Sequence, residues 1–331
     1  MPRKIALQID PLESLHRFRD TSLLLGLEAQ KRGDSIYYYE PNDLSFQTGV
    51  VQSPLKSLEL TLSDEGFSYQ VGSPIVTDLR EMDVILLRQN PPFDMSYLTT
   101  TYLLDQIADQ TLVLNNPTGV RNHVEKLLPL EFPSLTPPTL ISSDWEAIVA
   151  FCEQHPEVIL KPLLDFGGNS VFHIHSQQGQ LKSLYQLMKR SYPGLPFILQ
   201  PFIPEVLTGD KRLILIDGEL IGGFKRVPLK GEVRSNQLMG GLVKAYDISD
   251  KDREICQILG PRLRELGLFF VGIDVIGEYL IEINVTSPTG LHPLQELTGI
   301  QGPVLFWDRV EKIIGNNKNG SQYYNRSLSR Y

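Results

Sequence analysis

The stretch Phe269-Phe-Val-Gly-Ile-Asp-Val-Ile-Gly-Glu-Tyr-Leu-Ile-Glu-Ile-Asn284 decides the fold of the C-terminal part of this chain. Two runs rich in β-branched and aromatic residues lie on either side of Gly277, and this pattern predicts a β-hairpin. A two-residue turn at Gly277-Glu278 would place the carboxylates of Asp274 and Glu282 on opposite faces, because successive side chains on a strand alternate. The register of the hairpin therefore decides whether the two acids meet.

The apolar residues of the two runs favour a register in which the acids do meet. They share one buried face only if Ile273 lies opposite Ile283, since a slip of one residue would turn every side chain to the other face. That register requires a three-residue loop at 277–279. The predicted buried face consists of Val271, Ile273, Val275, Ile281, Ile283 and Val285.

The polar face of the same hairpin gathers oxygen ligands. Asp274 lies across from Glu282 in the favoured register, and Asn284 follows two residues along on the same side. Two carboxylates this close repel each other unless a cation or a basic side chain joins them. Oxygen ligands without His or Cys indicate Mg²⁺, or Mn²⁺ in its place. The alternative is the solvated outer face of an amphipathic hairpin, where these residue types are ordinary.

Composition limits the class of protein. The chain has 331 residues, 41% of them hydrophobic, which suffices for two or three packed domains. No run approaches the roughly 20 apolar residues that cross a bilayer, and no signal-peptide pattern opens the chain, so we expect a cytoplasmic protein without membrane contact. A net charge of -8 provides no basic field for nucleic acid. Cys152 and Cys256 lie in helical patterns and are expected to be reduced core thiols.

Three units follow one another along the chain. The first, 1–121, predicts a doubly wound parallel sheet because short apolar runs alternate with helical patterns. Its runs are 5–9, 35–39, 84–87 and 112–114, with helices at 22–32 and 97–108 and a polar excursion at 47–78. The second, 122–200, predicts a small antiparallel α+β lid with strands at 158–161, 170–175 and 197–200 and a helix at 181–189.

The third unit, 201–314, contains the hairpin. Its other predicted elements are strands at 212–216 and 220–226 and a helix at 250–266. The remaining residues, 315–331, have no apolar period and are expected to be disordered.

Glycines and lysines of the second unit suggest a phosphate site. Asp165-Phe-Gly-Gly-Asn-Ser170 lies between two predicted strands, so it is neither a Walker loop nor a dinucleotide fingerprint. Tandem glycines allow a hairpin tip to bring backbone N–H groups against an anion. Lys161 ends the preceding strand, and Lys126 lies in an apolar stretch. Each feature alone is typical of a plain turn or a surface charge. Together with a divalent ion they indicate a site for the phosphates of a nucleotide.

Several basic residues are candidates for the chemistry. Arg212, Arg226 and Arg234 lie on successive elements of the third unit and could stabilise charge that moves from ATP to a carboxylate. Arg88, which ends a strand of the first unit, is the matching candidate there. Ordinary surface salt bridges are the alternative. His173 and His175 alternate on one strand face, but the sequence indicates no third metal ligand, so we expect exposed histidines.

The motifs and their order resemble the prokaryotic-type glutathione synthetases of the ATP-grasp superfamily, over nearly the whole chain to about residue 300. The shared segments are 9–13, 27–33, 84–94, Ile159-Leu-Lys-Pro162, Gly209-Asp-Lys-Arg212, 270–276 and Glu282-Ile-Asn-Val-Thr-Ser-Pro-Thr289. The resemblance implies an ATP-grasp fold, α/β and α+β, behind an N-terminal parallel-sheet domain. It also implies an ATP-dependent ligase that joins γ-glutamylcysteine and glycine through an acyl phosphate and releases ADP and phosphate.

The resemblance further implies roles for individual residues. Those expected to bind ATP are Lys126, Lys161, Gly167, Gly168, Asn169, Ser170, Gln200, Pro201, Phe202, Ile203 and Asp210, with the adenine-side hinge at 199–203. The metal ligands would be Asp274, Glu282 and Asn284, and the catalytic arginines Arg212, Arg226 and Arg234. The dipeptide would be held by Arg88, Asn236, Gly240, Gly241, Ser287 and Thr289, with the loop 228–242 closing over the intermediate. A homo-oligomer is implied as well.

The chain departs from the family pattern in the parts expected to hold substrate. In the closing loop, Lys230-Gly231 replaces a glycine pair, Ser235 replaces glycine, and Leu242 replaces a basic residue. After Thr289, Leu291-His-Pro-Leu294 stands where the family usually has Ile-Arg-Glu. The first alternative is therefore a sister ATP-grasp ligase with another carboxylate or amine. The second is a nucleotide-binding paralogue without catalysis.

Overall fold

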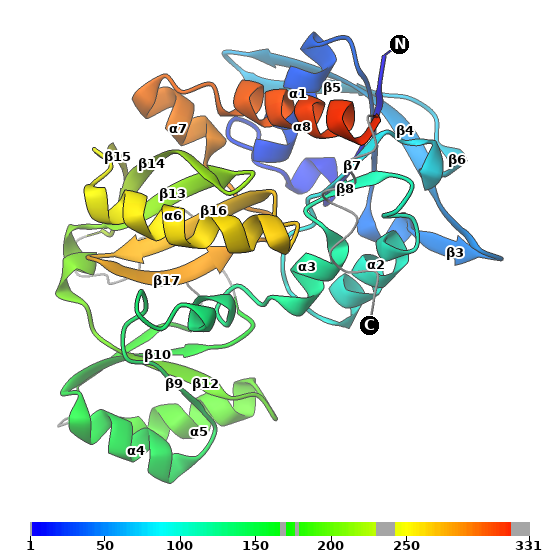
Figure 1. Ribbon diagram of the computed structural model, residues 1–331. Helices are drawn as coiled ribbons and strands as arrows, with labels where there is room; N and C mark the ends of the chain where they lie inside the picture. The colour runs from blue at the N-terminus through cyan, green and yellow to red at the C-terminus, as the bar shows by residue number, and fades with distance from the viewer. Residues whose placement is uncertain (1, 166–169, 176–178, 230–241, 319–331) are drawn as a thin grey trace.

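The computed structural model describes residues 2–165, 170–175, 179–229 and 242–318, which form three sheets (Figure 1). An eight-stranded sheet and its helices lie at the upper right of Figure 1, a five-stranded sheet lies in the middle, and a four-stranded sheet lies at the bottom. None of the helices in these ranges has the length and apolar content needed to span a bilayer.

The first sheet has a parallel centre with helices on both faces. Its order is β3-β4-β2-β1-β7-β8, and β1 (Lys4–Gln8), β2 (Ser35–Tyr39), β7 (Val84–Leu87) and β8 (Leu112–Leu114) run parallel. Ile5 and Leu7 share a core with α1 (Thr21–Lys31), whereas Ala6 shares one with α2 (Met95–Asp105), near α3 (Pro117–Asn122). Because alternate side chains of β1 enter the two cores, the predicted doubly wound parallel sheet is confirmed.

The polar segment 47–78 continues this sheet in regular strands. It contains β4 (Val50–Ser63), β5 (Gly66–Val71) and β6 (Ile75–Asp78), and β3 (Ser45–Gln47) precedes it. Antiparallel β4 pairs with β2 and also with β3, β5 and β6. Leu58, Leu60 and Phe67 are buried in the core that contains α1. The segment is therefore part of the sheet and not a polar excursion from it.

The four-stranded sheet carries helices on one face. Its antiparallel order is β11 (Phe172–His175), β10 (Glu157–Pro162), β12 (Phe197–Pro201) and β9 (Leu140–Ser142). Val158, Leu160 and Ile174 share a core with α4 (Trp145–Gln154) and α5 (Leu181–Ser191), and Cys152 is buried there. Since strand side chains alternate, Lys161 belongs to the face turned away from these helices.

The five-stranded sheet carries the hairpin at one edge. Its antiparallel order is β15 (Leu242–Ala245), β14 (Glu219–Val227), β13 (Asp210–Ile216), β16 (Phe270–Ile276) and β17 (Tyr279–Asn284). Leu213 and Leu215 share a core with α6 (Asp250–Glu265), where Cys256 is also buried. On the other face, Ile214 and Ile216 share a core with α7 (Leu291–Thr298) and α8 (Gly302–Lys318). Arg212 lies on this second face, beyond the apolar part of β13.

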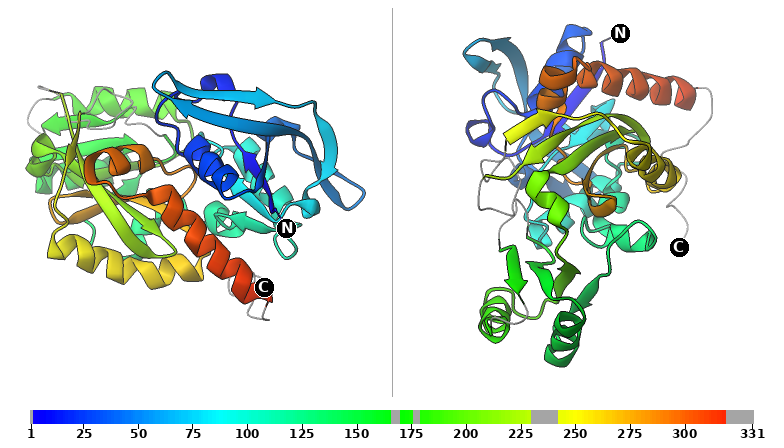
Figure 2. Two further views of the ribbon diagram at one scale, coloured as in Figure 1. Left: turned by 90° about the horizontal axis from the view of Figure 1, so that it is seen from above. Right: turned by 90° about the vertical axis from the view of Figure 1, so that its left-hand side faces the viewer.

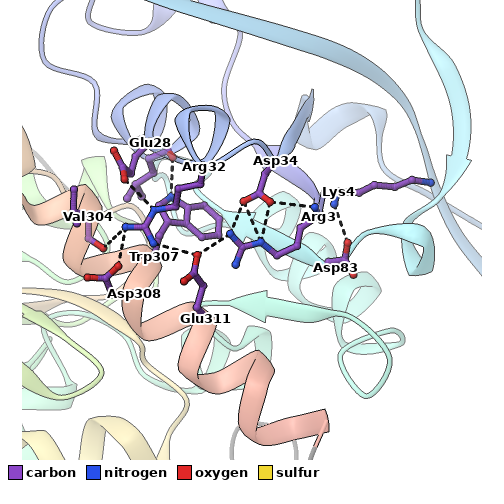
Figure 3. A network of polar contacts seen from close by, with 11 residues as sticks. Arg3, Lys4, Glu28, Arg32, Asp34, Asp83, Val304, Trp307, Asp308 and Glu311 are labelled. Carbon is purple, nitrogen blue, oxygen red and sulfur yellow. Dashed lines mark hydrogen bonds and ion pairs between the residues drawn. The ribbon is translucent and has the colours of Figure 1, made fainter. Parts of the chain in front are cut away.

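Helix α8 packs the C-terminal part of the chain against helix α1 of the first sheet. It lies along α1 in Figures 1 and 2, and Nε1 of the fully buried Trp307 donates a hydrogen bond of 2.8 Å to the carbonyl of Leu25. Figure 3 shows the polar contacts beside it, in which Arg32 pairs with Asp308 at 2.8 Å and Arg3 pairs with Glu311 at 3.0 Å. The helix continues to Lys318, so the expectation of a disordered tail from 315 is wrong for 315–318. Residues 319–331 lie outside the described ranges.

Candidate active site

The hairpin has the predicted register, but its turn is one residue shorter than predicted and a bulge compensates for the difference. Ile273 pairs with Ile283 and Asp274 with Glu282, as predicted. The three-residue loop is wrong, because Ile276 pairs with Tyr279 across a two-residue turn whose Gly277 has a φ of +57°. A bulge beside Asp274 inserts one extra residue in β17 and restores the register.

The bulge also changes which residue of β17 is buried. Leu280, which pairs with Val275, is fully buried, whereas the predicted Ile281 is only partly buried. The other five predicted members of the buried face are fully buried: Val271, Ile273, Val275, Ile283 and Val285.

Two arginines contact the carboxylate of Asp274. Nε and Nη2 of Arg212 donate to its two carboxylate oxygens at 2.5 and 3.0 Å, and Nη2 of Arg226 lies 3.0 Å from its Oδ1. Burial alone would raise the pKa of Asp274, but the charges and hydrogen bonds of Arg212 and Arg226 outweigh it and hold the pKa at about 2. The carboxylate is therefore ionised at neutral pH.

Glu282 and Asn284 lie on the same side of the hairpin as Asp274. Nδ2 of Asn284 donates to Oδ2 of Asp274 at 3.3 Å and to the carbonyl of Gly272 at 3.2 Å. Oε1 of Glu282 lies 3.6 Å from Nζ of Lys126. The three oxygen-bearing side chains therefore converge, and two arginines and a lysine surround them. Carboxylate and amide oxygens of this kind fit a hard divalent cation.

Two lysines approach this group from other parts of the chain. Lys161 on β10 is buried, and burial lowers its pKa to about 8; Lys126 acts in the same direction, while Glu282 and Asp274 oppose it. Lys126 donates a hydrogen bond to the carbonyl of Asp165, at the start of the glycine turn. A buried ammonium group beside carboxylates is suited to neutralise a bound anion such as a phosphate.

Arg88 offers a binding group in the first sheet. It is buried, and its Nε donates to Ser22 Oγ at 3.1 Å, but its Nη1 has no hydrogen-bond partner among the described residues. Burial lowers the pKa of Arg88 to about 10, and Asp20 opposes the shift. Oγ of Ser287 donates to the carbonyl of Arg88 at 3.2 Å, which joins this strand end to the loop after the hairpin. A buried guanidinium with an unused N–H is suited to hold a carboxylate.

Comparison with known proteins identifies the family. Residues 3–121 match the family model for the N-terminal domain of prokaryotic glutathione synthetase, and residues 125–299 match the model for its ATP-grasp domain. The chain belongs to the prokaryotic glutathione synthetase family. The predicted resemblance is therefore confirmed, and so is the prediction of an ATP-dependent ligase.

Curated relatives of the glutathione synthetase family match almost from end to end. The glutathione synthetase of Rhodopseudomonas palustris is 46% identical over 311 residues, which cover 94% of this chain and 99% of the relative. That of Brucella melitensis is 45% identical over 311 residues with the same coverage. The alternative of a non-catalytic paralogue is not supported by this similarity.

Solved structures share the fold. D-cycloserine synthetase DcsG matches with a TM-score of 0.66 and 14% identity, over 94% of this chain and 99% of that chain. The RimK domain ATP-grasp protein from Sphaerobacter thermophilus matches with a TM-score of 0.62 and 17% identity, over 92% and 98%. At these identities the likeness concerns the fold alone, and it confirms the predicted ATP-grasp architecture.

The other residues expected to bind ATP in this glutathione synthetase family member lie along the four-stranded sheet and β13. Gln200 is buried and donates to Thr139 Oγ1 at 3.0 Å, while 201–203 are partly buried. Ser170 accepts a hydrogen bond of 2.8 Å from the hydroxyl of Tyr192. The carboxylate of Asp210 is paired with Arg226, which places it beside the arginines.

Some expected substrate residues are placed and others are not. Thr289 is exposed, and its carbonyl accepts from Nη1 of Arg212 at 3.3 Å. The remaining expected residues lie outside the described ranges: Gly167, Gly168, Asn169, Arg234, Asn236, Gly240 and Gly241. The departures from the family pattern at Leu242 and 291–294 are described. Leu242 is 57% exposed at the start of β15, and burial lowers the pKa of His292 on α7.

Sequence reasoning missed two residues that fix the end of the hairpin. Oε1 of Glu125 accepts hydrogen bonds from the backbone N–H of Val285 at 3.0 Å, from that of Thr286 at 3.1 Å and from its hydroxyl at 2.7 Å. Asn115 donates to the carbonyls of Phe270 and Val285 at 2.9 and 2.7 Å. A charged residue beside Lys126 in an apolar stretch was the available signal for Glu125, whereas nothing local marks Asn115.

Proposed function

We propose that the group around Asp274 is the catalytic centre of glutathione synthesis, the reaction of the family to which this chain belongs. In this reaction γ-glutamylcysteine and glycine are joined while ATP is converted to ADP and phosphate. The observation that carries the proposal is the convergence of Asp274, Glu282 and Asn284 with two arginines and two lysines drawn from separate parts of the chain.

The proposed reaction has two steps. The glycyl-accepting carboxylate of the dipeptide attacks the γ-phosphorus of ATP, the bond to the β-phosphate oxygen breaks, and ADP leaves. The amine of glycine then attacks the acyl phosphate, phosphate leaves with the bonding electron pair, and the amine loses a proton as the peptide bond forms. Excluding water protects the acyl phosphate from hydrolysis between the steps.

Charge complementarity supports the roles of the basic residues. We assign Lys126 and Lys161 to the ATP phosphates, because Lys161 is buried next to the acidic side chains and gains a partner when an anion binds. We assign Arg212 and Arg226 to the transferring phosphoryl group, where fixed cations stabilise developing charge. When bound by Asp274, Glu282 and Asn284, Mg²⁺ or Mn²⁺ would neutralise phosphate charge and polarise the γ-phosphoryl group.

The dipeptide is assigned to the side of the site formed by the first sheet. Arg88 has a buried N–H without a partner in the described ranges and lies next to the Ser287 loop through the hydrogen bond to its carbonyl. A bound carboxylate would satisfy this N–H. This placement would bring the dipeptide between the first sheet and the hairpin.

Three finer features are also proposed. We take 1–121, 122–200 and 201–314 as the working domains, which the three sheets and the matched ranges 3–121 and 125–299 support. The family relationship supports a homo-oligomer in the cytoplasm. Light scattering coupled to size-exclusion chromatography tests the oligomer, and a molar mass of one chain would overturn it.

The experiment that tests the function is a coupled ADP-release assay on the purified protein. With ATP, Mg²⁺ and γ-glutamylcysteine, we expect turnover that depends on glycine, and mass spectrometry should detect glutathione. Leu242 and His292 favour one competing candidate, a sister ligase with another carboxylate or amine. Amino acids and related dipeptides offered in the same assay separate the two, since a clear preference for another pair would refute glutathione synthesis.

A further inference from the structure

A second group of metal-ligating side chains lies on the four-stranded sheet. Glu157 of β10 and His173 and His175 of β11 bring their ligand atoms within 4.8 Å of one another. It is the one such group of His, Cys, Asp or Glu found in the described ranges. Along β10, Lys161 lies four residues from Glu157, or ~13 Å at the rise of a strand, so this group is separate from the lysines assigned to the ATP phosphates. It borders the expected adenine-side hinge, because His173 contacts Phe202.

Strand pairing creates the group. His173 and His175 are two residues apart on β11, so their side chains leave the same face. Glu157 pairs with His175 in the register of β10 and β11, and Ile159 pairs with His173. The carboxylate therefore lies beside both imidazoles. The expectation of exposed histidines holds for His175, whereas His173 is only partly exposed. The sequence indicated no third candidate ligand because Glu157 lies on a neighbouring strand.

The distances suit an ion with nitrogen and oxygen ligands. Nε2 of His173 lies 2.9 Å from Oε2 of Glu157, and Nδ1 of His175 lies 3.8 Å from Oε1. Ligand atoms of a tetrahedral zinc ion lie ~3.3 Å apart, given metal–ligand bonds of ~2.0–2.2 Å. Small side-chain rotations would meet that spacing. One end of the cluster is held in place, because the ring of His173 stacks on Phe202 at a centroid distance of 4.0 Å.

The group is open to solvent. The side chains of Glu157 and His175 are 45% and 44% exposed, and that of His173 is 20% exposed, so an ion could enter and keep a water ligand. Two imidazoles and one carboxylate form a ligand set that suits zinc and its neighbours in the first transition series, whereas Mg²⁺ prefers oxygen ligands alone. The chemistry therefore differs from that of the Asp274 group.

We propose that Glu157, His173 and His175 bind one divalent transition-metal ion of the zinc type. The competing explanation is a carboxylate that pairs with protonated histidine, which accounts for the 2.9 Å contact without an ion. The two explanations differ in whether Zn²⁺ binds, because an ion pair between Glu157 and His173 needs no metal ion, whereas the proposed site takes up one ion.

The test is a titration of the metal-free full-length protein with Zn²⁺ against a chromophoric chelator, at pH of about 7.5. Excess Mg²⁺ is present to occupy the oxygen-only site. We expect one equivalent of Zn²⁺ to bind in the micromolar range or tighter. Glu157→Gln and His175→Ala should each weaken binding by about 10-fold or more, and the double variant His173→Ala/His175→Ala should abolish it.

A matched control comes from the same domain. His155 ends α4 and lies against Phe151, outside the group, so His155→Ala should bind Zn²⁺ like the unchanged protein. Cys152 and Cys256 are buried and offer no accessible thiol. Thermal unfolding curves confirm that each variant is folded. Equal binding by the histidine variants, or failure of the unchanged protein to bind in the micromolar range, overturns the proposal.

Discussion

Arg212 and Asp274 face each other on the paired strands β13 and β16 and share two hydrogen bonds, of 2.5 and 3.0 Å. Their side chains are only 8% and 10% exposed. The carboxylate thus balances the buried charges of Arg212 and Arg226, and in the proposed function it also binds the metal ion. Loss of this carboxylate should therefore affect both stability and catalysis.

Asp274→Asn should lower kcat by about 100-fold or more, because it removes a charged ligand of the metal ion that would neutralise the reacting phosphates. It should also cost about 3–5 kcal/mol of unfolding free energy, since it leaves buried arginine charge without its partner.

Asp252→Asn is the matched control. Asp252 accepts from Lys211 Nζ at 2.6 Å and is fully buried, but Lys211 belongs to the opposite face of β13. The control should lose stability while its kcat stays within a few-fold, and an equal loss of kcat in both variants would contradict the metal role.

Arg88→Met should raise the KM for γ-glutamylcysteine by about 10- to 100-fold, because a hydrogen bond to a charged group contributes about 1.5–3 kcal/mol. The KM for ATP should stay unchanged. Arg121→Met provides the comparison, because Arg121 also has a buried Nη1 without a partner among the described residues but lies on α3 and pairs with Asp105. Steady-state kinetics on both variants decide the matter, and an unchanged dipeptide KM in Arg88→Met would refute the assignment.

The alternation of apolar residues was enough to predict the register of the hairpin, but not the type of turn that produces this register. The alternation of apolar residues requires Ile273 opposite Ile283, and any turn must satisfy that pairing. A two-residue turn with a bulge and a three-residue loop both do so. The choice between them depends on the backbone at Gly277, where the φ of +57° suits glycine.

Contacts between distant segments could not be predicted from one sequence. The third ligand beside His175 is Glu157, which only the pairing of β10 with β11 reveals. The pairing of Asp210 with Arg226 likewise follows from the register of β13 and β14. Asn115 and Glu125 contact the hairpin from more than a hundred residues away. No periodicity in the sequence encodes such distances.

Glu125 should act as a positioning residue for the loop after the hairpin. Glu125→Ala removes the acceptor of three hydrogen bonds and should lower kcat/KM for the dipeptide by about 10- to 100-fold, as loss of supporting contacts often does. Glu125→Gln keeps an oxygen in the same position and should restore most of the activity. Glu131→Ala is the control, since Glu131 is exposed and pairs with Arg262 on the surface. If alanine and glutamine at position 125 behave alike, the positioning role is wrong.

ATP binding should take up protons near pH 8. Burial lowers the pKa of Lys161 to about 8, and phosphate charge should raise it again, so the fraction protonated increases on binding. Calorimetric titrations with ATP and Mg²⁺ in two buffers of different ionisation enthalpy measure this uptake. It should fall towards zero near pH 6.5, where Lys161 is already protonated. Lys161→Arg should show no uptake at pH 8, and unchanged uptake in this variant would exclude Lys161 as its source.

The same shift affects the stability of the free protein. Between pH about 8 and 10.5, the unfolded chain binds more protons at Lys161 than the folded chain, because the folded pKa is the lower one. The contribution of Lys161 to the free energy of unfolding therefore rises with pH through this window. Below pH 8 both states are protonated, and the cost of burying the ammonium group is fully present.

Trp307 should make the first sheet and the C-terminal part of the chain unfold together. It is fully buried, and its Nε1 donates a hydrogen bond to the carbonyl of Leu25 on α1. Trp307→Ala should cost about 3–5 kcal/mol of unfolding free energy, whereas Trp307→Phe keeps most of the volume and loses a hydrogen bond of about 1 kcal/mol plus some packing. Urea unfolding followed by circular dichroism measures both.

The chain's other tryptophan gives the comparison. Trp145 is only partly buried and packs on Tyr185 within the four-stranded sheet's own helices, so Trp145→Ala should cost less and leave the contact between α1 and α8 intact. In the Trp145→Phe background, fluorescence reports Trp307 alone. Because Trp307 is in the core shared by α1, α7 and α8, its fluorescence should change together with the loss of helix in the first sheet and C-terminal part. A Trp307 transition at clearly lower urea, with the helical signal intact, would show that α8 detaches first and that the shared core does not unfold as one unit.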